Sequence, residues 1–346
     1  LFVGRFHQEA TSMTVRVAIN GFGRIGRPFF RLAFEDPCID IVAINDLMDN
    51  KTFAHLLQYD STFGKYKREV AYDADNLIED GEKSKIFSIN DPQRLPWKEL
   101  GVDIVLESTG KFTTMEKASA HLAAGAKKVI LSAPAKGEMP TFVYGVNHIE
   151  YNPATDNIIS NASCTTNALA PVAKIIDDAF GIVSAMMTTV HSYTNDQAIL
   201  DKGHRDLRRA RTAGSSIIPT TTGATKAVEL ILPQLKGKLS GCSIRVPTPD
   251  VSLIDFTLEL ENKVTVKDIN NVLQQASLGS FKGLVGYSEE PLVSVDYIGE
   301  TNSCVVDSLS TMVVGEKMAK IILWYDNEYG YSCRLKDLIK YMEGRS

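Results

Sequence analysis

The chain has 346 residues, of which 44% are hydrophobic and 23% are charged, and this length suits about two globular domains. Its formal net charge of −5 contains no basic excess, so we do not expect nucleic acid as a main partner. No apolar run reaches the roughly 18 residues of a membrane span, and five scattered cysteines without a C-x-x-C pair indicate neither a disulfide framework nor a zinc site. We therefore expect a cytoplasmic protein with no membrane partner and no metal.

The first predicted strand begins at Val15. The preceding residues 1–12, "LFVGRFHQEATS", show no structural period, and we interpret them as a tag or leader remnant. From Val15 onward, the apolar run "VRVAIN", a helical pattern from Arg24 to Asp36 and the run "DIVAIND" predict a βαβ unit, because Pro37 stops the helix between two strands.

Strand-like runs continue this alternation through the first half of the chain. A helical pattern that ends at Gly125 separates two of them. Continuous apolar runs are typical of buried parallel strands, so we predict an α/β fold with an N-terminal Rossmann-type doubly wound sheet. The runs are Val102 to Thr109, Lys127 to Ala133 and Asn157 to Ser163.

A G-x-G-x-x-G pattern lies between the first strand and the first helix. Gly21 allows a tight turn, Gly23 lets a pyrophosphate approach the backbone, and Gly26 lets helix and strand pack closely. Asp46 ends the second strand, where its carboxylate accepts hydrogen bonds from ribose hydroxyls and repels a 2′-phosphate. For the glycine motif alone, a plain glycine turn is the alternative interpretation. The motif together with Asp46 indicates an NAD-binding domain over residues 13–163.

The pattern changes after Ser163. A helix from Thr165 to Phe180 leads into longer alternating strands, which predict an α+β catalytic domain with a mostly antiparallel sheet over residues 164–325. Residues 195–223 show no clear period, and a segment of this length inside a compact domain is usually functional or disordered. A final helical pattern lies within residues 326–346.

Three residues of the second half are candidates for a nucleophile, its proton-transfer partner and a phosphate-binding cation. Cys164 stands where a strand meets a helix, and a helix N-terminus favours the thiolate and lowers its pKa. His191 lies in an alternating strand and is able to move a proton to or from Cys164. Arg245 supplies a forked cation for a phosphate. A buried inert cysteine, a core histidine and a solvated arginine are the alternatives.

Five motifs in order, "INGFGRIGR", "SNASCTTNALAP", "HSYTNDQ", "RVPTPDVS" and "WYDNEYGYS", resemble phosphorylating glyceraldehyde-3-phosphate dehydrogenase over residues 15–342. The resemblance implies that the helix within residues 326–346 completes the NAD-binding domain. It also implies a homotetramer that binds NAD, glyceraldehyde 3-phosphate and inorganic phosphate, with Cys164 as nucleophile and His191 as its acid-base partner. It further implies two sets of contacts. Those to NAD are Arg24, Ile25, Asp46, Ser132 and Asn327, and those to substrate or phosphate are Ser163, Thr165, Thr194, Thr222, Gly223 and Arg245.

Two departures from the family pattern bear on specificity. Lys202 and Gly203 stand where many strictly NAD-dependent bacterial relatives have Leu-Pro, and the run "TAGSS" replaces an alanine-rich one. Erythrose-4-phosphate dehydrogenase is the alternative enzyme, although Asp46 and the run "TTTG" favour the triose phosphate. A reductase of aspartyl or glutamyl phosphate lacks the full motif set. A non-catalytic binding or adhesion protein on the same fold is the alternative of another class.

Overall fold

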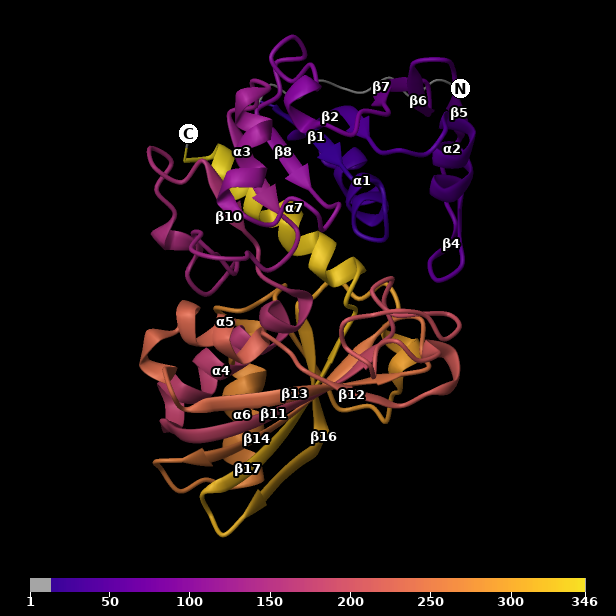
Figure 1. Cartoon of the computed structure of the whole chain (residues 1–346). Coiled ribbons are helices and arrows are strands. Elements are labelled where there is room, and N and C mark those ends of the chain that lie inside the picture. The colour runs from indigo at the N-terminus through magenta and orange to yellow at the C-terminus, as the bar shows by residue number, and fades with distance from the viewer. Residues whose placement is uncertain (1–13, 346) are drawn as a thin grey trace, which may run out of the picture.

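Two sheets, one from each half of the chain, organise the molecule (Figure 1). The structure is a computed structural model and describes residues 14–345. The segment interpreted as a tag or leader remnant, residues 1–12, lies outside the described residues. No helix among residues 14–345 is long and apolar enough to cross a membrane.

The N-terminal sheet has eight strands in the order β10-β9-β8-β1-β2-β7-β6-β5, and the six strands from β10 to β7 are parallel. The chain leaves β1 toward β2 on one side and later returns to β8 on the other, which makes the edge beyond β1 a ligand crevice. The strands are β1 Val15–Asn20, β2 Ile39–Asn45, β5 Val70–Tyr72, β6 Asn76–Glu79, β7 Glu82–Phe87, β8 Ile104–Glu107, β9 Lys128–Leu131 and β10 Ile158–Ser160.

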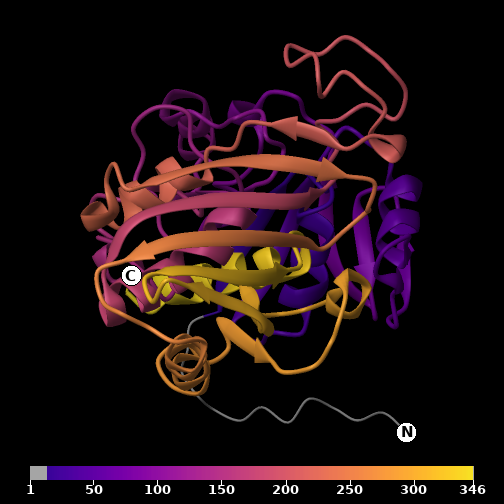
Figure 2. The same ribbon diagram turned by 90° about the horizontal axis from the view of Figure 1, so that it is seen from below.

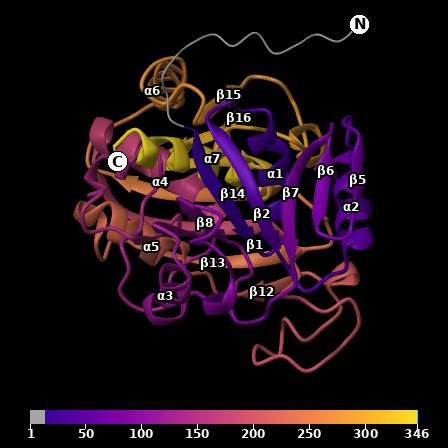
Figure 3. The same ribbon diagram turned by 90° about the horizontal axis from the view of Figure 1, so that it is seen from above.

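Helices cover both faces of this sheet, which explains why its strands read as continuous apolar runs. α1 (Gly26–Phe34) and α7 (Tyr329–Glu343) pack on the face that carries Val17, and α3 (Met115–Ala123) covers strands β9 and β10 (Figure 3). The doubly wound fold is therefore confirmed. α1 is two residues shorter at each end than predicted. The sequence did not predict α2 (Asn50–Gln58), the antiparallel strands β5 and β6, or the small pair β3 (Tyr59–Asp60) and β4 (Gly64–Lys65).

The C-terminal sheet has seven strands in the order β12-β13-β11-β14-β17-β16-β15. Four of its six pairings are antiparallel, as predicted, whereas β11 with β13 and β15 with β16 are parallel. The strands are β11 Ile182–Ser192, β12 Ile218–Thr220, β13 Leu239–Val246, β14 Ser252–Leu260, β15 Val285–Ser288, β16 Cys304–Val314 and β17 Met318–Tyr325.

Apolar and polar residues alternate along the strands of this sheet because helices cover only one of its faces. Buried side chains alternate along β14, and the covered face packs on α4 (Cys164–Phe180), α5 (Ala224–Ile231) and α6 (Val266–Leu278). Figure 2 shows the strands from the side away from the N-terminal sheet. Residues 195–217 project from the body as a long loop, and the short β12 follows them (Figure 2).

Candidate active site

The glycine loop after β1 has the geometry that its three glycines predict. Gly21 adopts a φ of +101°, and a Cβ on Gly26 would lie 2.2 Å from the carbonyl oxygen of Gly21. A Cβ on Gly23 would meet no atom within 4 Å. Gly21 and Gly26 are thus required by the fold, whereas Gly23 leaves open space against the backbone where a pyrophosphate fits.

Asp46 lies directly after β2, at the edge where the glycine loop begins. Its carboxylate accepts hydrogen bonds from the backbone N–H of Phe22 at 2.7 Å and of Leu47 at 2.6 Å. The carboxylate is therefore held in place by the loop itself. Its contact with the ribose of NAD stays a prediction.

The side chain of Arg24 is committed to other protein groups. Its Nε lies 2.9 Å from Oε2 of Glu328, and Nη2 bonds the same carboxylate. The other amino group, Nη1, lies 2.5 Å from Oδ2 of Asp60. These two carboxylates raise the pKa of Arg24 above its ordinary value against the effect of burial. A contact of Arg24 with NAD is therefore restricted to its backbone N–H, which together with that of Ile25 precedes α1.

A buried polar network joins the strand ends below the glycine loop. Trp97 Nε1 donates to His121 Nδ1 at 3.1 Å, so the proton of His121 is on Nε2, which lies 3.0 Å from Oε2 of Glu107. The same carboxylate oxygen accepts from Asn20 Nδ2 at 2.6 Å, and Asn45 Nδ2 donates to Asn20 at 2.7 Å. β1, β2 and β8 are thus cross-linked where they carry the cofactor loop. No sequence pattern predicts this network, because its partners are far apart in the chain.

Cys164 is the first residue of α4, and the strand β11 brings His191 to it. The side chain of Ser163 caps the helix by accepting from the N–H of Thr166 at 3.0 Å. Cys164 Sγ lies 3.6 Å from His191 Nε2. The parallel register of β11 and β13 places Arg245 opposite His191, with one amino group 2.9 Å from Nδ1 of the ring. Three motifs separated in the sequence therefore meet at one point.

Burial dominates the protonation of this pair. It raises the pKa of the Cys164 thiol to about 11, although the charge of Arg245 and hydrogen bonds from Thr165 oppose the shift. Burial also lowers the pKa of His191 to about 3, and Arg245 adds to this effect. The expectation of a lowered thiol pKa was therefore wrong, because desolvation outweighs the helix N-terminus. At neutral pH the pair consists of a thiol and a neutral imidazole.

Family comparisons agree with this arrangement. The profile described as "Glyceraldehyde 3-phosphate dehydrogenase, NAD binding domain" matches residues 15–115, and the one described as "Glyceraldehyde 3-phosphate dehydrogenase, C-terminal domain" matches residues 163–327. The chain belongs to the glyceraldehyde-3-phosphate dehydrogenase family. It is an NAD-dependent oxidoreductase, and the prediction of NAD as its cofactor is confirmed.

Relatives in this family span nearly the whole chain. Glyceraldehyde-3-phosphate dehydrogenase of Geobacillus stearothermophilus is 58% identical over 96% of this chain and 99% of its own length. The Priestia megaterium enzyme of the same name is 57% identical over 96% of this chain and 99% of its own length. Glyceraldehyde-3-phosphate dehydrogenase 1 of Bacillus subtilis is 57% identical over 95% of this chain and 98% of its own length.

The residues that the family resemblance assigns to phosphate groups lie on separate elements. Thr222 and Gly223 precede α5, where the Oγ1 of Thr222 accepts from the N–H of Ala224 at 3.2 Å. Thr194 follows β11 at the start of the long loop. Among the ion pairs of residues 14–345, none involves Arg245, a half-buried cation that is thus available to bind an anion. The structure brings Arg245 to His191 but shows no hydrogen bond that joins Thr222 or Gly223 to Cys164 or His191.

Tyr325 is a site residue that sequence reasoning missed. Its hydroxyl lies 2.9 Å from Oγ1 of Thr165 and 2.9 Å from Oγ1 of Thr189, and its ring contacts the ring of His191 edge-on. Thr165 follows Cys164 directly, so Tyr325 fixes the first turn of α4 against the sheet. Only its place in the "WYDNEYGYS" motif could have indicated it.

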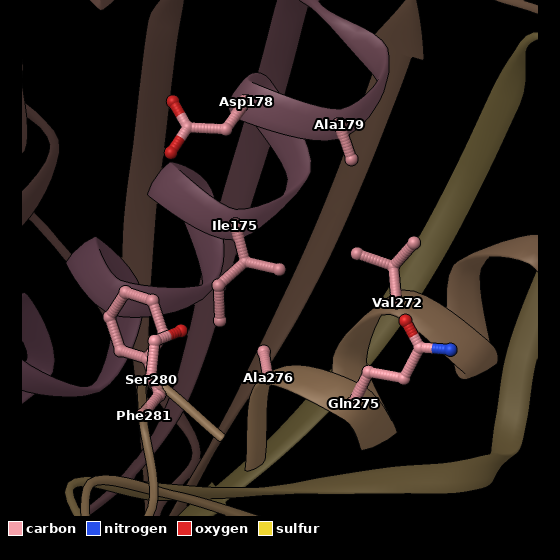
Figure 4. Close-up of a pocket in the computed structure, with 8 residues that line it drawn as sticks. All are labelled: Ile175, Asp178, Ala179, Val272, Gln275, Ala276, Ser280 and Phe281. Carbon is pink, nitrogen blue, oxygen red and sulfur yellow. The ribbon is translucent and has the colours of Figure 1, made fainter. Parts of the chain in front are cut away.

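A pocket of about 420 Å³ between α4 and α6 is separate from this site. Figure 4 shows Ile175 of α4 and Val272 of α6 at its walls. Ile175 is eleven residues after Cys164 along one helix, which corresponds to roughly 16 Å. The pocket therefore takes no part in the chemistry at Cys164.

Proposed function

We propose that this protein oxidises D-glyceraldehyde 3-phosphate with NAD and inorganic phosphate to 1,3-bisphosphoglycerate, as a step of glycolysis. The contact between Cys164 Sγ and His191 Nε2 at 3.6 Å carries this proposal, because it joins a nucleophile to a base beside Arg245, a half-buried cation without an ion pair among the described residues. The names of the relatives support the substrate.

The residues of the site supply the steps of the reaction. The sulfur of Cys164 attacks the aldehyde carbon to form a thiohemiacetal, while its proton passes to His191 and then to the new alkoxide. NAD, when bound, accepts the hydride from that carbon. His191 takes the hydroxyl proton as the hydride leaves, and a thioester results. Inorganic phosphate then attacks the thioester carbon and displaces the thiolate of Cys164, which gives the acyl phosphate.

Two anion subsites flank the thioester in this proposal. Arg245 and Thr194 bind the phosphate of the substrate, and the N–H groups at the start of α5, near Thr222 and Gly223, receive inorganic phosphate. The hydroxyls of Ser163 and Thr165 are the substrate contacts nearest to Cys164. On the cofactor side, Ser132, directly after β9, and Asn327, after β17, contact NAD.

The experiment follows the absorbance of reduced nicotinamide with purified protein, NAD and either glyceraldehyde 3-phosphate or erythrose 4-phosphate, each with and without inorganic phosphate. We expect fast reduction with the triose phosphate that depends on inorganic phosphate. Preference for erythrose 4-phosphate would transfer the proposal to that substrate. No reduction with either aldehyde would contradict it, and a protein that binds NAD without catalysis would remain.

We also infer that the protein is a cytoplasmic homotetramer with a domain boundary between residues 163 and 164 and an NAD-binding domain completed by residues 326–345. The long loop presents four exposed apolar side chains, and Ile199 and Leu207 are 87% and 81% exposed. Side chains of this kind mark a contact with another protein surface. The four are Ile199, Leu200, Leu207 and Ile217.

Light scattering after size-exclusion chromatography tests the tetramer. We expect a mass of four chains for the wild type and a smaller species for Leu207→Asp, since a charge at a buried contact is costly. The matched control Leu278→Asp changes an exposed leucine on α6 and should leave the mass unchanged. A monomeric wild type would contradict the inference.

A further inference from the structure

The side-chain amide of Asn327 is held at a junction of three strand ends. Asn327 follows β17 by two residues and is buried. Its Oδ1 lies 2.9 Å from Oγ of Ser192, the last residue of β11, and 2.7 Å from Oγ of Ser252, the first residue of β14. The register of β14 with β17 pairs Ser252 with Tyr325, so the sheet itself brings these residues together.

The hydrogen-bond directions at this junction follow from its donors. Ser252 Oγ accepts from the backbone N–H of Ser192 at 3.1 Å and has its own proton to donate. Both serines are fully buried, and within residues 14–345 the amide oxygen of Asn327 is the only acceptor that their hydroxyls reach. With the amide reversed, both hydroxyl protons would be left without an acceptor. Oδ1 therefore faces the serines, and the N–H groups of Nδ2 are left for a ligand.

We propose that Ser192 and Ser252 are positioning residues that fix the amide of Asn327 so that Nδ2 donates to the carboxamide oxygen of NAD and selects one face of the nicotinamide ring. This inference rests on the proposal that Asn327 contacts NAD. A single donor direction distinguishes the two ring orientations related by rotation about the glycosidic bond. The hydride from the substrate carbon then arrives on one face of C4.

Ser192 also connects this arrangement to the base. Its backbone carbonyl oxygen lies 2.7 Å from Nδ1 of His191, and its hydroxyl bonds Asn327. One residue thus sets the ring of the base through its carbonyl and the cofactor amide through its hydroxyl. Ser192→Ala deletes only the second contact, which makes the two roles separable.

The test uses the full-length variants Ser192→Ala, Ser252→Ala and the double variant. Ser308→Ala is the control, because it removes a buried hydroxyl bond of 2.6 Å to the carbonyl of Ser288 elsewhere in the same sheet. Tryptophan fluorescence quenching gives the Kd for NAD. NMR of the cofactor reduced from [4-²H]NAD gives the face of hydride transfer.

We expect the double variant to raise the Kd for NAD about tenfold and to place a measurable fraction of the hydride on the opposite face, with smaller effects in the single variants. The control should keep the wild-type Kd and a single face. A wild-type Kd and a single face in a folded double variant would overturn the inference. If the double variant does not fold, wild-type values in both single variants would overturn it. Asn327→Ala tests the contact with NAD separately from the role of the serines. Unchanged NAD binding in that variant would show that Asn327 does not contact the cofactor.

Discussion

At the residue scale, the ring of His191 has two neighbours that favour different tautomers. Nδ1 lies 2.7 Å from the carbonyl oxygen of Ser192, which requires a proton on Nδ1, and 2.9 Å from an amino group of Arg245, which requires a lone pair there. Only the first arrangement leaves the lone pair of Nε2 facing Cys164. The base therefore works best when an anion draws the guanidinium of Arg245 away from the ring.

Arg245→Gln tests the electrostatic part of this relation. After burial, the charge of Arg245 is the next largest cause that lowers the His191 pKa, so its loss raises that pKa from about 3 toward the ordinary value. Because a base acts only when deprotonated, the acidic limb of kcat/KM should move to higher pH, and KM for the phosphorylated aldehyde should rise about 100-fold. The pH-rate profile is the measurement, with exposed Arg94→Gln as control. An unmoved acidic limb would contradict the coupling.

Cys164→Ser tests the nucleophile. A hydroxyl is far less nucleophilic than a thiolate, so the dehydrogenase rate should fall on the order of 10⁴-fold, while the Kd for NAD changes less than about twofold. Initial rates and fluorescence titration measure the two effects. Cys242→Ser, at an exposed cysteine of β13, should keep full activity. Near-normal turnover in Cys164→Ser would remove Cys164 from its role.

At the scale of elements, the sequence predicted best where local and tertiary preferences agree. β1, α1 and β2 combine apolar runs, glycines and a terminal proline, and α4 has a serine cap with an apolar face, so each was placed to within a few residues. β5 and β6 are short and partly exposed, and they pair only because β7 extends the sheet edge. Their sequences therefore lack a period of their own.

The contacts within the candidate site could not be predicted from the sequence, for a different reason. The cysteine, histidine and arginine each have a chemistry that a single motif indicates. The side chains of Tyr325, Ser192 and Ser252 bond partners that lie 60 or more residues away, and their chemistry is common to many buried residues. The raised thiol pKa was also hidden, since desolvation depends on packing rather than on the helix start.

Two substitutions in the glycine loop should affect protein stability and NAD binding separately. Gly23→Ala adds a methyl group where no atom lies within 4 Å, so the melting temperature should be unchanged while the Kd for NAD rises at least about tenfold. Gly26→Ala forces a Cβ to 2.2 Å from the Gly21 oxygen, so it should lower the stability by about 1–3 kcal/mol. Thermal melting and NAD titration measure both, with Gly344→Ala as the control, since a Cβ there would make only ordinary contacts of 3.6 and 3.7 Å. Equal Kd effects of Gly23→Ala and Gly344→Ala would count against the pyrophosphate assignment.

At the scale of the whole molecule, the last helix connects the two halves of the chain. α7 leaves the C-terminal sheet after β17 and crosses to the N-terminal domain (Figure 1). Glu328 bonds Arg24 of the glycine loop, and Lys340 donates to Asp36 after α1 at 2.8 Å. Tyr331 donates to the carbonyl of Ala162, two residues before Cys164, at 2.9 Å. The contacts of α7 therefore fix the glycine loop and the start of α4 relative to each other.

Buried carboxyl groups lie at the C-terminal end of β17, where α7 begins. Asp250 is only 3% exposed, and burial together with the charges of Asp326 and Glu328 raises its pKa to about 9. The folded protein therefore keeps a proton on Asp250 at pH values where the unfolded chain, with an ordinary value near 4, has released it. The contribution of this group to stability is complete below about pH 4 and is lost as the pH rises through about 9.

Asp250→Asn should remove this dependence, because a neutral amide of the same shape has no proton to lose. We expect the variant to melt above the wild type by a few degrees at pH 8 to 9, on the order of 1 kcal/mol or more, and the difference to shrink toward pH 5. Thermal melting between pH 5 and pH 9 measures it. Asp75→Asn, at an exposed position, is the matched control. If the Asp250→Asn difference does not change with pH, the proton on Asp250 does not set the alkaline stability of this junction.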